Sequence, residues 1–200
     1  MKIKFPKFSG IRCLMMPYIQ GDPSSVPEQY RKGYEDIIKN IVLDIGKIGY
    51  LTIDESLAKK GKPHRGDRSK TDRALHTEAG LHPDAMYCWG GETYGWGRGN
   101  RVTLERDTEV LLANSIDNTC AYWDTEHENT SLDGDIGHES EKYPFSNAVY
   151  MKAGEVHKIG ILTPHESLPV VKDIKRQFLR IIGEGVHGRE EHFTINPLMV

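Results

Sequence analysis

A histidine and a carboxylate separated by one residue, His76 and Glu78, are the first pair in the sequence that could do metal chemistry. On a β-strand, residues i and i+2 point to the same face, so both side chains could bind one metal ion side by side. A later histidine, His165, comes after a turn and a strand-like run at 152–156. Two histidines and one carboxylate with open coordination positions form a set that suits non-haem Fe(II).

An arginine, Arg176, opens a strand-forming run downstream of His165. A guanidinium is a rigid fork of N–H donors that matches a carboxylate, so Arg176 could anchor a carboxylate co-substrate beside the metal. Lys175 is the open alternative, because neighbouring residues of a strand face opposite ways and a shift of one residue would exchange them. His157, within an earlier strand-like run, is the rival to His165 as the third ligand.

The elements around these candidates are predicted to be one helix followed by many short strands. Ser25 and Pro27 form a helix-start signal, and apolar residues then recur at helical spacing, which predicts a helix over 26–46. Strand formers dominate the rest of the chain, and turn residues separate them. The expected strands lie at 50–53, 101–105, 109–112, 119–123, 148–151, 156–161 and 177–182. This pattern indicates a mostly β fold, a sandwich or barrel with a flanking helix.

Length and composition limit the class of protein. The 200 residues suit one domain with a real core, and 26 Lys and Arg against 29 Asp and Glu exclude a globally basic nucleic-acid binder. With 38% hydrophobic residues and no long apolar run, we expect no membrane span and no secretory signal. Three widely spaced cysteines fit a reduced, cytoplasmic chain.

The order of these features resembles the Fe(II)- and 2-oxoglutarate-dependent dioxygenases, most of all their phytanoyl-CoA-hydroxylase-like and prolyl-hydroxylase-like branches. The resemblance covers residues 50–183 and rests on the spacing of His76, Glu78, His165 and Arg176. It implies a double-stranded β-helix, the jelly-roll or cupin-like barrel. The chain is then a single domain over 1–200, with a helical segment at 1–49, the barrel at 50–183 and a tail at 184–200.

The same resemblance implies the roles of these residues. His76, Glu78 and His165 would hold Fe(II), and Arg176 would hold the far carboxylate of 2-oxoglutarate. The implied reaction uses O2 to oxidise an unactivated C–H bond of a small molecule, with succinate and CO2 as co-products. The sequence departs from the family in two respects: Glu78 stands where aspartate is commoner, and Lys175 is adjacent to Arg176.

Two polar stretches flank the first ligand pair. Residues 58–73 are strongly basic, which suggests a cationic lid over an anionic substrate or a plain solvated loop. The glycine-rich residues 90–100, with Trp89, Tyr94 and Trp96, could line a substrate pocket or pack in the core. Two other functions stay open: a cupin-type metal enzyme that does not use 2-oxoglutarate, and a non-catalytic β-sandwich binding module.

Overall fold

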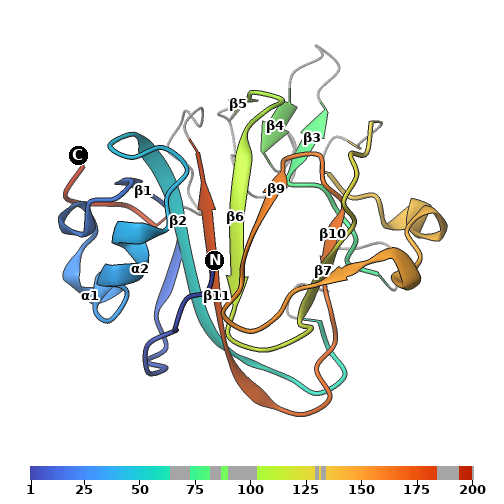
Figure 1. The fold of residues 1–200 in the computed structure, drawn as a ribbon, viewed down its shortest axis with the longest axis horizontal. Helices are drawn as coiled ribbons and strands as arrows, with labels where there is room; N and C mark the ends of the chain where they lie inside the picture. Colours follow the sequence, from blue (N-terminus) through green and yellow to red (C-terminus); the bar gives the residue numbers. More distant parts are fainter. Residues whose placement is uncertain are drawn as a thin grey trace.

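The computed structural model describes residues 1–63, 73–81, 87–89, 103–128, 131, 134–183 and 194–199. The fold is mostly β, with few helices (Figure 1). Its largest sheet is antiparallel and has five strands in the order β1-β2-β11-β6-β9. Their bounds are β1 Arg12–Ile19, β2 Ile48–Ala58, β11 Ile174–Ile182, β6 Glu109–Asn114 and β9 Val156–Gly160.

A second antiparallel sheet, in the order β10-β7-β8, lies on the opposite side of the interior (Figure 1). Its strands are β10 His165–Ser167, β7 Cys120–Tyr122 and β8 Val149–Tyr150. Residue 76 adds to it, because His76 forms an antiparallel bridge with His165, the first residue of β10. A small third sheet contains β3 Ala79–Leu81, β4 Tyr87–Trp89 and β5 Thr103–Leu104.

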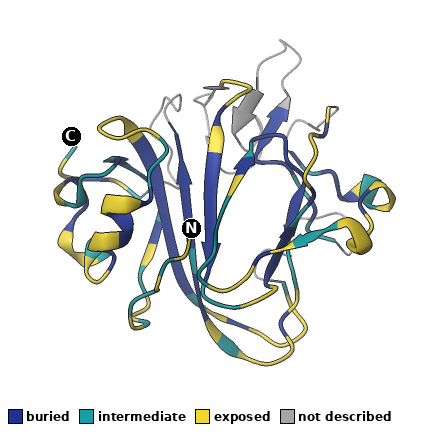
Figure 2. Ribbon diagram, in the orientation of Figure 1, coloured by how far each residue is buried: buried dark blue, intermediate teal, exposed yellow. Residues whose placement is uncertain are grey.

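Alternation along β11 assigns its side chains to two different layers. Phe178 and Ile182 pack into the cluster between the sheets, with Leu112, Met151 and Ile159. Leu179 and Ile181, at the alternate positions, pack into the cluster between the large sheet and the helices. A β-strand buried on both faces needs apolar side chains at consecutive positions, and Figure 2 shows β11 and β6 buried along most of their length. The inward face of β11 therefore points into the interior that holds the candidate site.

The predicted helix over 26–46 is wrong in extent. The structure has two short helices, α1 Glu28–Arg31 and α2 Glu35–Asn40, after a 3₁₀ turn, η1 Pro23–Ser25. The break falls at Gly33, which has φ +84 and whose missing Cβ would lie 2.9 Å from the side chain of Pro6. The two helices lie beside β1 and β2 (Figure 1), and the segment 1–49 also contains a strand, β1, that the sequence did not predict.

Glu55, on β2, ties the N-terminal segment to the large sheet. Its buried carboxylate accepts hydrogen bonds from the backbone or side chains of Ser9, Gly10, Ile11, Tyr34 and Gln177. Burial works to raise the pKa of this carboxyl, but the hydrogen bonds outweigh burial and hold its pKa below the usual value.

The edge of the large sheet that β1 forms is irregular. The pairing of β1 with β2 shifts register between Cys13 and Met16, and β1 also contains Pro17. The C-terminal residues lie along this strand: Thr194 exchanges hydrogen bonds with Leu14, and Asn196 donates to the carbonyl of Pro17.

Short 3₁₀ helices complete the described chain, η2 Gly137–Lys142 and η3 Phe145–Asn147. Among the described residues, no helix has the length and apolar character needed to cross a membrane.

Candidate metal and anion site

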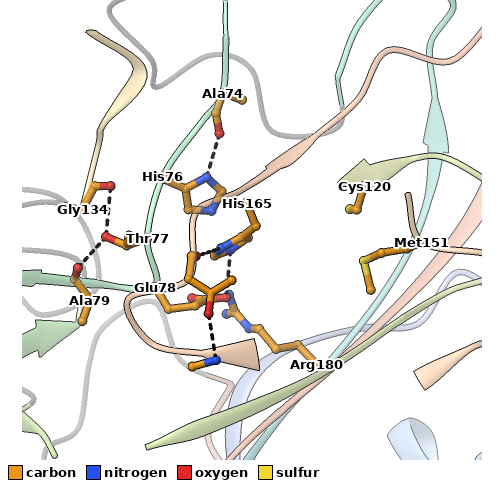
Figure 3. Close-up of polar contacts among 12 residues, drawn as sticks. Ala74, His76, Thr77, Glu78, Ala79, Cys120, Gly134, Met151, His165 and Arg180 are labelled. Atoms are coloured by element: carbon orange, nitrogen blue, oxygen red, sulfur yellow. Dashed lines mark hydrogen bonds and ion pairs between the residues drawn. The ribbon is translucent and has the colours of Figure 1, made fainter. Parts of the chain in front are cut away.

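Backbone pairing brings the two predicted histidine ligands together. The N–H of His76 donates to the carbonyl of His165 at 3.0 Å, and the N–H of His165 donates back to His76 at 2.9 Å. Residues that exchange both hydrogen bonds lie directly opposite each other, and their side chains project to the same side. The two imidazole rings are 4.2 Å apart between centroids (Figure 3).

Both rings are oriented by their neighbouring backbone. His76 Nδ1 lies 2.7 Å from the carbonyl oxygen of Ala74, and His165 Nδ1 lies 2.9 Å from that of Thr163. A carbonyl oxygen can only accept, so each Nδ1 carries a proton, and in the neutral form of either ring the lone pair would lie on Nε2. Histidines that bind metals are commonly held in this way, with one ring nitrogen donating to a carbonyl and the other left as the ligand.

Glu78 joins the histidines from the same segment. Its Oε1 lies 3.5 Å from His165 Nε2, and its side chain is buried. Arg180, on β11, reaches across from the large sheet, and its Nη1 lies 3.1 Å and 3.2 Å from the two carboxylate oxygens. A buried carboxylate needs compensation for the water it has lost, and the guanidinium provides it. The structure therefore brings His76, Glu78 and His165 to one place, with Arg180 as a fourth member.

The donor set of this cluster suits a divalent transition metal, with two imidazole nitrogens and a carboxylate. In the part of the chain that the structure describes, however, no three His, Cys, Asp or Glu side chains are arranged so that they could hold a metal ion as they stand. Both oxygens of Glu78 face Arg180 in this arrangement. Metal ligation by all three residues would require the Glu78 carboxylate to turn away from that guanidinium.

Arg176 lies on the inward face of β11, two positions before Phe178, and only 1% of it is exposed. Its guanidinium donates to Asn114 Oδ1, to Thr119 Oγ1 at 3.4 Å and to Cys120 Sγ at 3.4 Å. Among the described residues, its Nη1 has no hydrogen-bond partner and no carboxylate forms an ion pair with it. A buried cation without a counter-ion is costly, and a bound anion would remove that cost.

The structure shows which of the two neighbouring cationic residues of β11, Lys175 or Arg176, faces the interior. Lys175 is exposed, and its Nζ lies 4.9 Å from the ring centroid of Phe8, on the outside of the sheet. Arg176 points inward, as the interpretation of the sequence preferred. His157, the rival third ligand, is on β9, where its ring packs against Tyr122 at 5.6 Å and its Nε2 lies 3.9 Å from Glu155.

Two supporting residues were not predicted from the sequence. Arg180 stands four residues after Arg176 on one strand, so alternation alone could have placed both on the same face. Gly134 backs the ligand segment: it has φ +74, and a Cβ there would lie 2.5 Å from the carbonyl oxygen of Thr77. The acidic composition around Gly134 gave no signal for this contact.

The basic segment 58–73 is only partly described. Lys59 pairs with Asp173 on the surface, and Arg73 is fixed by an ion pair with the buried Glu166 and by two backbone carbonyls. These contacts hold the Arg73 side chain against described residues, and the lid stays a prediction. Residues 64–72 lie outside the described residues. So do the glycine-rich stretch 90–100 and the side chain of Trp89, so the predicted aromatic pocket stays a prediction.

Comparisons of the chain with protein-family models, with curated proteins and with solved structures found no match. The geometry of the cluster therefore carries the functional argument.

Proposed function

We propose that this chain is a metal-dependent oxygenase of the Fe(II)- and 2-oxoglutarate-dependent kind. One arrangement carries the proposal: His165 Nε2 lies 3.5 Å from the Glu78 carboxylate, the His76 ring lies 4.2 Å from the His165 ring, and the inward face of β11 carries the buried Arg176, for which the described residues supply no carboxylate. A metal ligand set beside a separate carboxylate anchor is what a dicarboxylate co-substrate requires.

The strand order supports a double-stranded β-helix. We number in chain order β2, the 76–79 segment, β6, β7, β8, β9, β10 and β11. The large sheet, without β1, then has the order 1-8-3-6. The second sheet, with the bridge between His76 and His165, has the order 2-7-4-5. These orders match those expected for an eight-stranded jelly roll, in which the ligand pair and the late histidine would come from neighbouring strands, and the match supports the proposed fold.

The chain's own side chains have separate tasks in this proposal. His76, Glu78 and His165 would hold Fe(II), which together with 2-oxoglutarate and O2 would supply the oxidising chemistry. Arg176 would bind the far carboxylate of 2-oxoglutarate through Nη1, which has no hydrogen-bond partner among the described residues. The apolar residues around the interior would keep bulk water from the reacting centre. Those side chains include Leu112, Met151, Ile159 and Phe178.

The first test separates this function from a binding module. Purified protein should bind about one equivalent of Mn(II), an air-stable stand-in for Fe(II), as measured by electron paramagnetic resonance. Binding should be lost in His76→Ala and His165→Ala. The exposed His138→Ala is the matched control and should bind like the wild type. Equal Mn(II) binding by all four proteins would contradict the proposed site.

The second test separates it from a cupin-type enzyme that does not use 2-oxoglutarate. With Fe(II), O2 and ascorbate, the wild type should convert 2-oxoglutarate to succinate slowly even without its true substrate. His165→Ala should abolish the conversion. Metal binding without any succinate formation over a wide range of 2-oxoglutarate concentration would favour the cupin alternative. The same assay can screen substrates, beginning with anionic small molecules because of the basic segment 58–73.

A further inference from the structure

Cys120 places a thiol beside the guanidinium of Arg176, whose Nη1 has no hydrogen-bond partner among the described residues. It is on β7, 9% exposed, and packs between the sheets with Leu112 and Met151. It forms no disulfide. Its Sγ lies 3.4 Å from Arg176 Nη2 and 4.0 Å from Asn114 Oδ1. Figure 3 shows the Cys120 side chain in the same view as His165 and Arg180.

Arg176 points independently to an anionic ligand at this place. It is more than nine-tenths buried, and within the described chain its Nη1 has no hydrogen-bond partner. A carboxylate bound at this guanidinium would therefore lie close to the thiol. The atom next to that carboxylate would be held near Sγ, and such proximity raises the effective concentration of the reacting groups by orders of magnitude.

We propose that Cys120 is a covalent modification site for small electrophiles that carry a carboxylate, with Arg176 as the group that selects them. The Cys120 thiolate attacks the carbon next to the carboxylate. A C–S bond forms and the bond to the leaving group breaks, and its electron pair departs with the leaving group. The thiol proton goes to solvent. The carboxylate of the adduct then pairs with Arg176 and closes the anion site.

This inference uses the same arginine as the proposed function but needs no metal and no turnover. If it holds, modification of Cys120 competes with any anionic ligand of Arg176. Under the proposed function that ligand is 2-oxoglutarate, so the modification would also switch the enzyme off.

The test compares iodoacetate with iodoacetamide, which have the same reactive carbon and leaving group and differ only in charge. Native, metal-free protein is treated with each reagent, and labelling rates at every cysteine are measured by peptide mass spectrometry. The reference is the same pair of rates in urea-unfolded protein. We expect the iodoacetate-to-iodoacetamide ratio at Cys120 to be at least about tenfold above that reference. Cys13 is the internal control, because burial raises the pKa of its thiol to about 12 and should keep it slow with both reagents.

Variants show whether Arg176 causes the selectivity. Arg176→Met should return the Cys120 ratio to the unfolded value, and Arg176→Lys, which keeps the charge, should retain part of the preference. Lys175→Met, on the outer face of the same strand, should leave the ratio unchanged. An unselective or unreactive Cys120 in the native protein, or a ratio that is the same in wild type and Arg176→Met, would overturn the inference.

Added 2-oxoglutarate distinguishes the failure of this inference from failure of the proposed function. Protection of Cys120 from iodoacetate by 2-oxoglutarate, but not by its neutral diester, supports both. Selective labelling without protection, in Mn(II)-loaded protein as well as in metal-free protein, keeps the modification site and removes 2-oxoglutarate as the ligand of Arg176. Succinate formation in a protein whose Cys120 shows no charge selectivity keeps the function and removes the modification site.

Discussion

Arg180 and Glu78 form a buried ion pair that joins the two sheets, with Arg180 Nη1 lying 3.1 Å and 3.2 Å from the two carboxylate oxygens. Under the proposed function, this guanidinium occupies the position that the metal would take on Glu78. A divalent ion would then have to compete with the guanidinium for this carboxylate, and the strength of the ion pair would set part of the metal affinity.

Arg180→Met should raise Mn(II) affinity by about tenfold at pH 8, because the competing cation is removed and one factor of ten corresponds to ~1.4 kcal/mol. Without metal the variant should be less stable than the wild type by about 3–5 kcal/mol, since the buried Glu78 carboxylate loses the guanidinium that compensates its burial. Saturating Mn(II) should therefore raise its melting temperature more than that of the wild type. Isothermal titration and thermal unfolding measure the two effects.

Arg176→Met is the control, because it removes an equally buried guanidinium that does not contact Glu78. Weaker Mn(II) binding by Arg180→Met would show that Arg180 orients Glu78 for ligation and does not compete.

Arg176→Ala should weaken 2-oxoglutarate binding while leaving Mn(II) binding nearly intact. A lost hydrogen-bonded charge typically costs about 1.5–3 kcal/mol, which corresponds to roughly 10- to 150-fold in the dissociation constant. Displacement titration with the Mn(II)-loaded protein gives both constants. Lys175→Ala, one residue away on the outer face, should match the wild type, and a loss of affinity there would contradict the observed register of β11.

Gly134→Ala should destabilise the ligand segment itself. Its φ of +74 is unfavourable for any residue with a Cβ, and that Cβ would meet the Thr77 carbonyl at 2.5 Å. We expect a loss of about 2–4 kcal/mol in the free energy of unfolding, from the backbone penalty and the clash together. Gly46→Ala separates the two causes: it has φ +77 with no atom within 4 Å of the added Cβ, so it should lose only about 1–2 kcal/mol. If urea unfolding gave equal losses of stability for Gly134→Ala and Gly46→Ala, the backbone around Thr77 would accommodate the added Cβ without a measurable penalty.

The hydrogen bonds to Glu55 predict how stability depends on pH. They outweigh burial and hold its pKa in the folded protein below the usual value of 4.5, so the ionised form favours folding. This contribution is present above pH 4.5 and is lost as the pH falls through the lower, folded-state pKa. Glu55→Gln should therefore be less stable than the wild type at pH 7 by about 1–3 kcal/mol, and the gap should narrow toward pH 3. Urea unfolding across this range measures it; a gap that does not change with pH would contradict the assignment to ionisation.

The sequence predicted those parts of the fold that local patterns determine. Strands such as 109–112 and 177–182 alternate or concentrate strand formers, and the structure has β6 and β11 there. β1 was missed because Pro17 and the bulge at Cys13 and Met16 break the alternation that identifies a strand. The single helix was wrong because apolar spacing continues across Gly33, where the close approach of Pro6 favours a residue without a side chain.

The candidate site divides in the same way. The spacing of His76 and Glu78 is local, and the inward orientation of Arg176 follows from alternation on one strand. The backbone pairing of His76 with His165 is a long-range contact that no local pattern encodes. The contact of Gly134 with Thr77 and the turn of Glu78 toward Arg180 also depend on tertiary packing, and they could be seen only in the folded chain.

The irregularity of β1 also affects how two molecules of this protein can meet. An outer strand with unused N–H and C=O groups is a ready template on which another chain can add a strand. Here the bulge twists that edge, Pro17 has no N–H to offer, and Thr194 and Asn196 already take backbone groups of Leu14 and Pro17. This edge therefore resists the addition of a strand from another molecule, because the C-terminal residues that lie on β1 cover part of it.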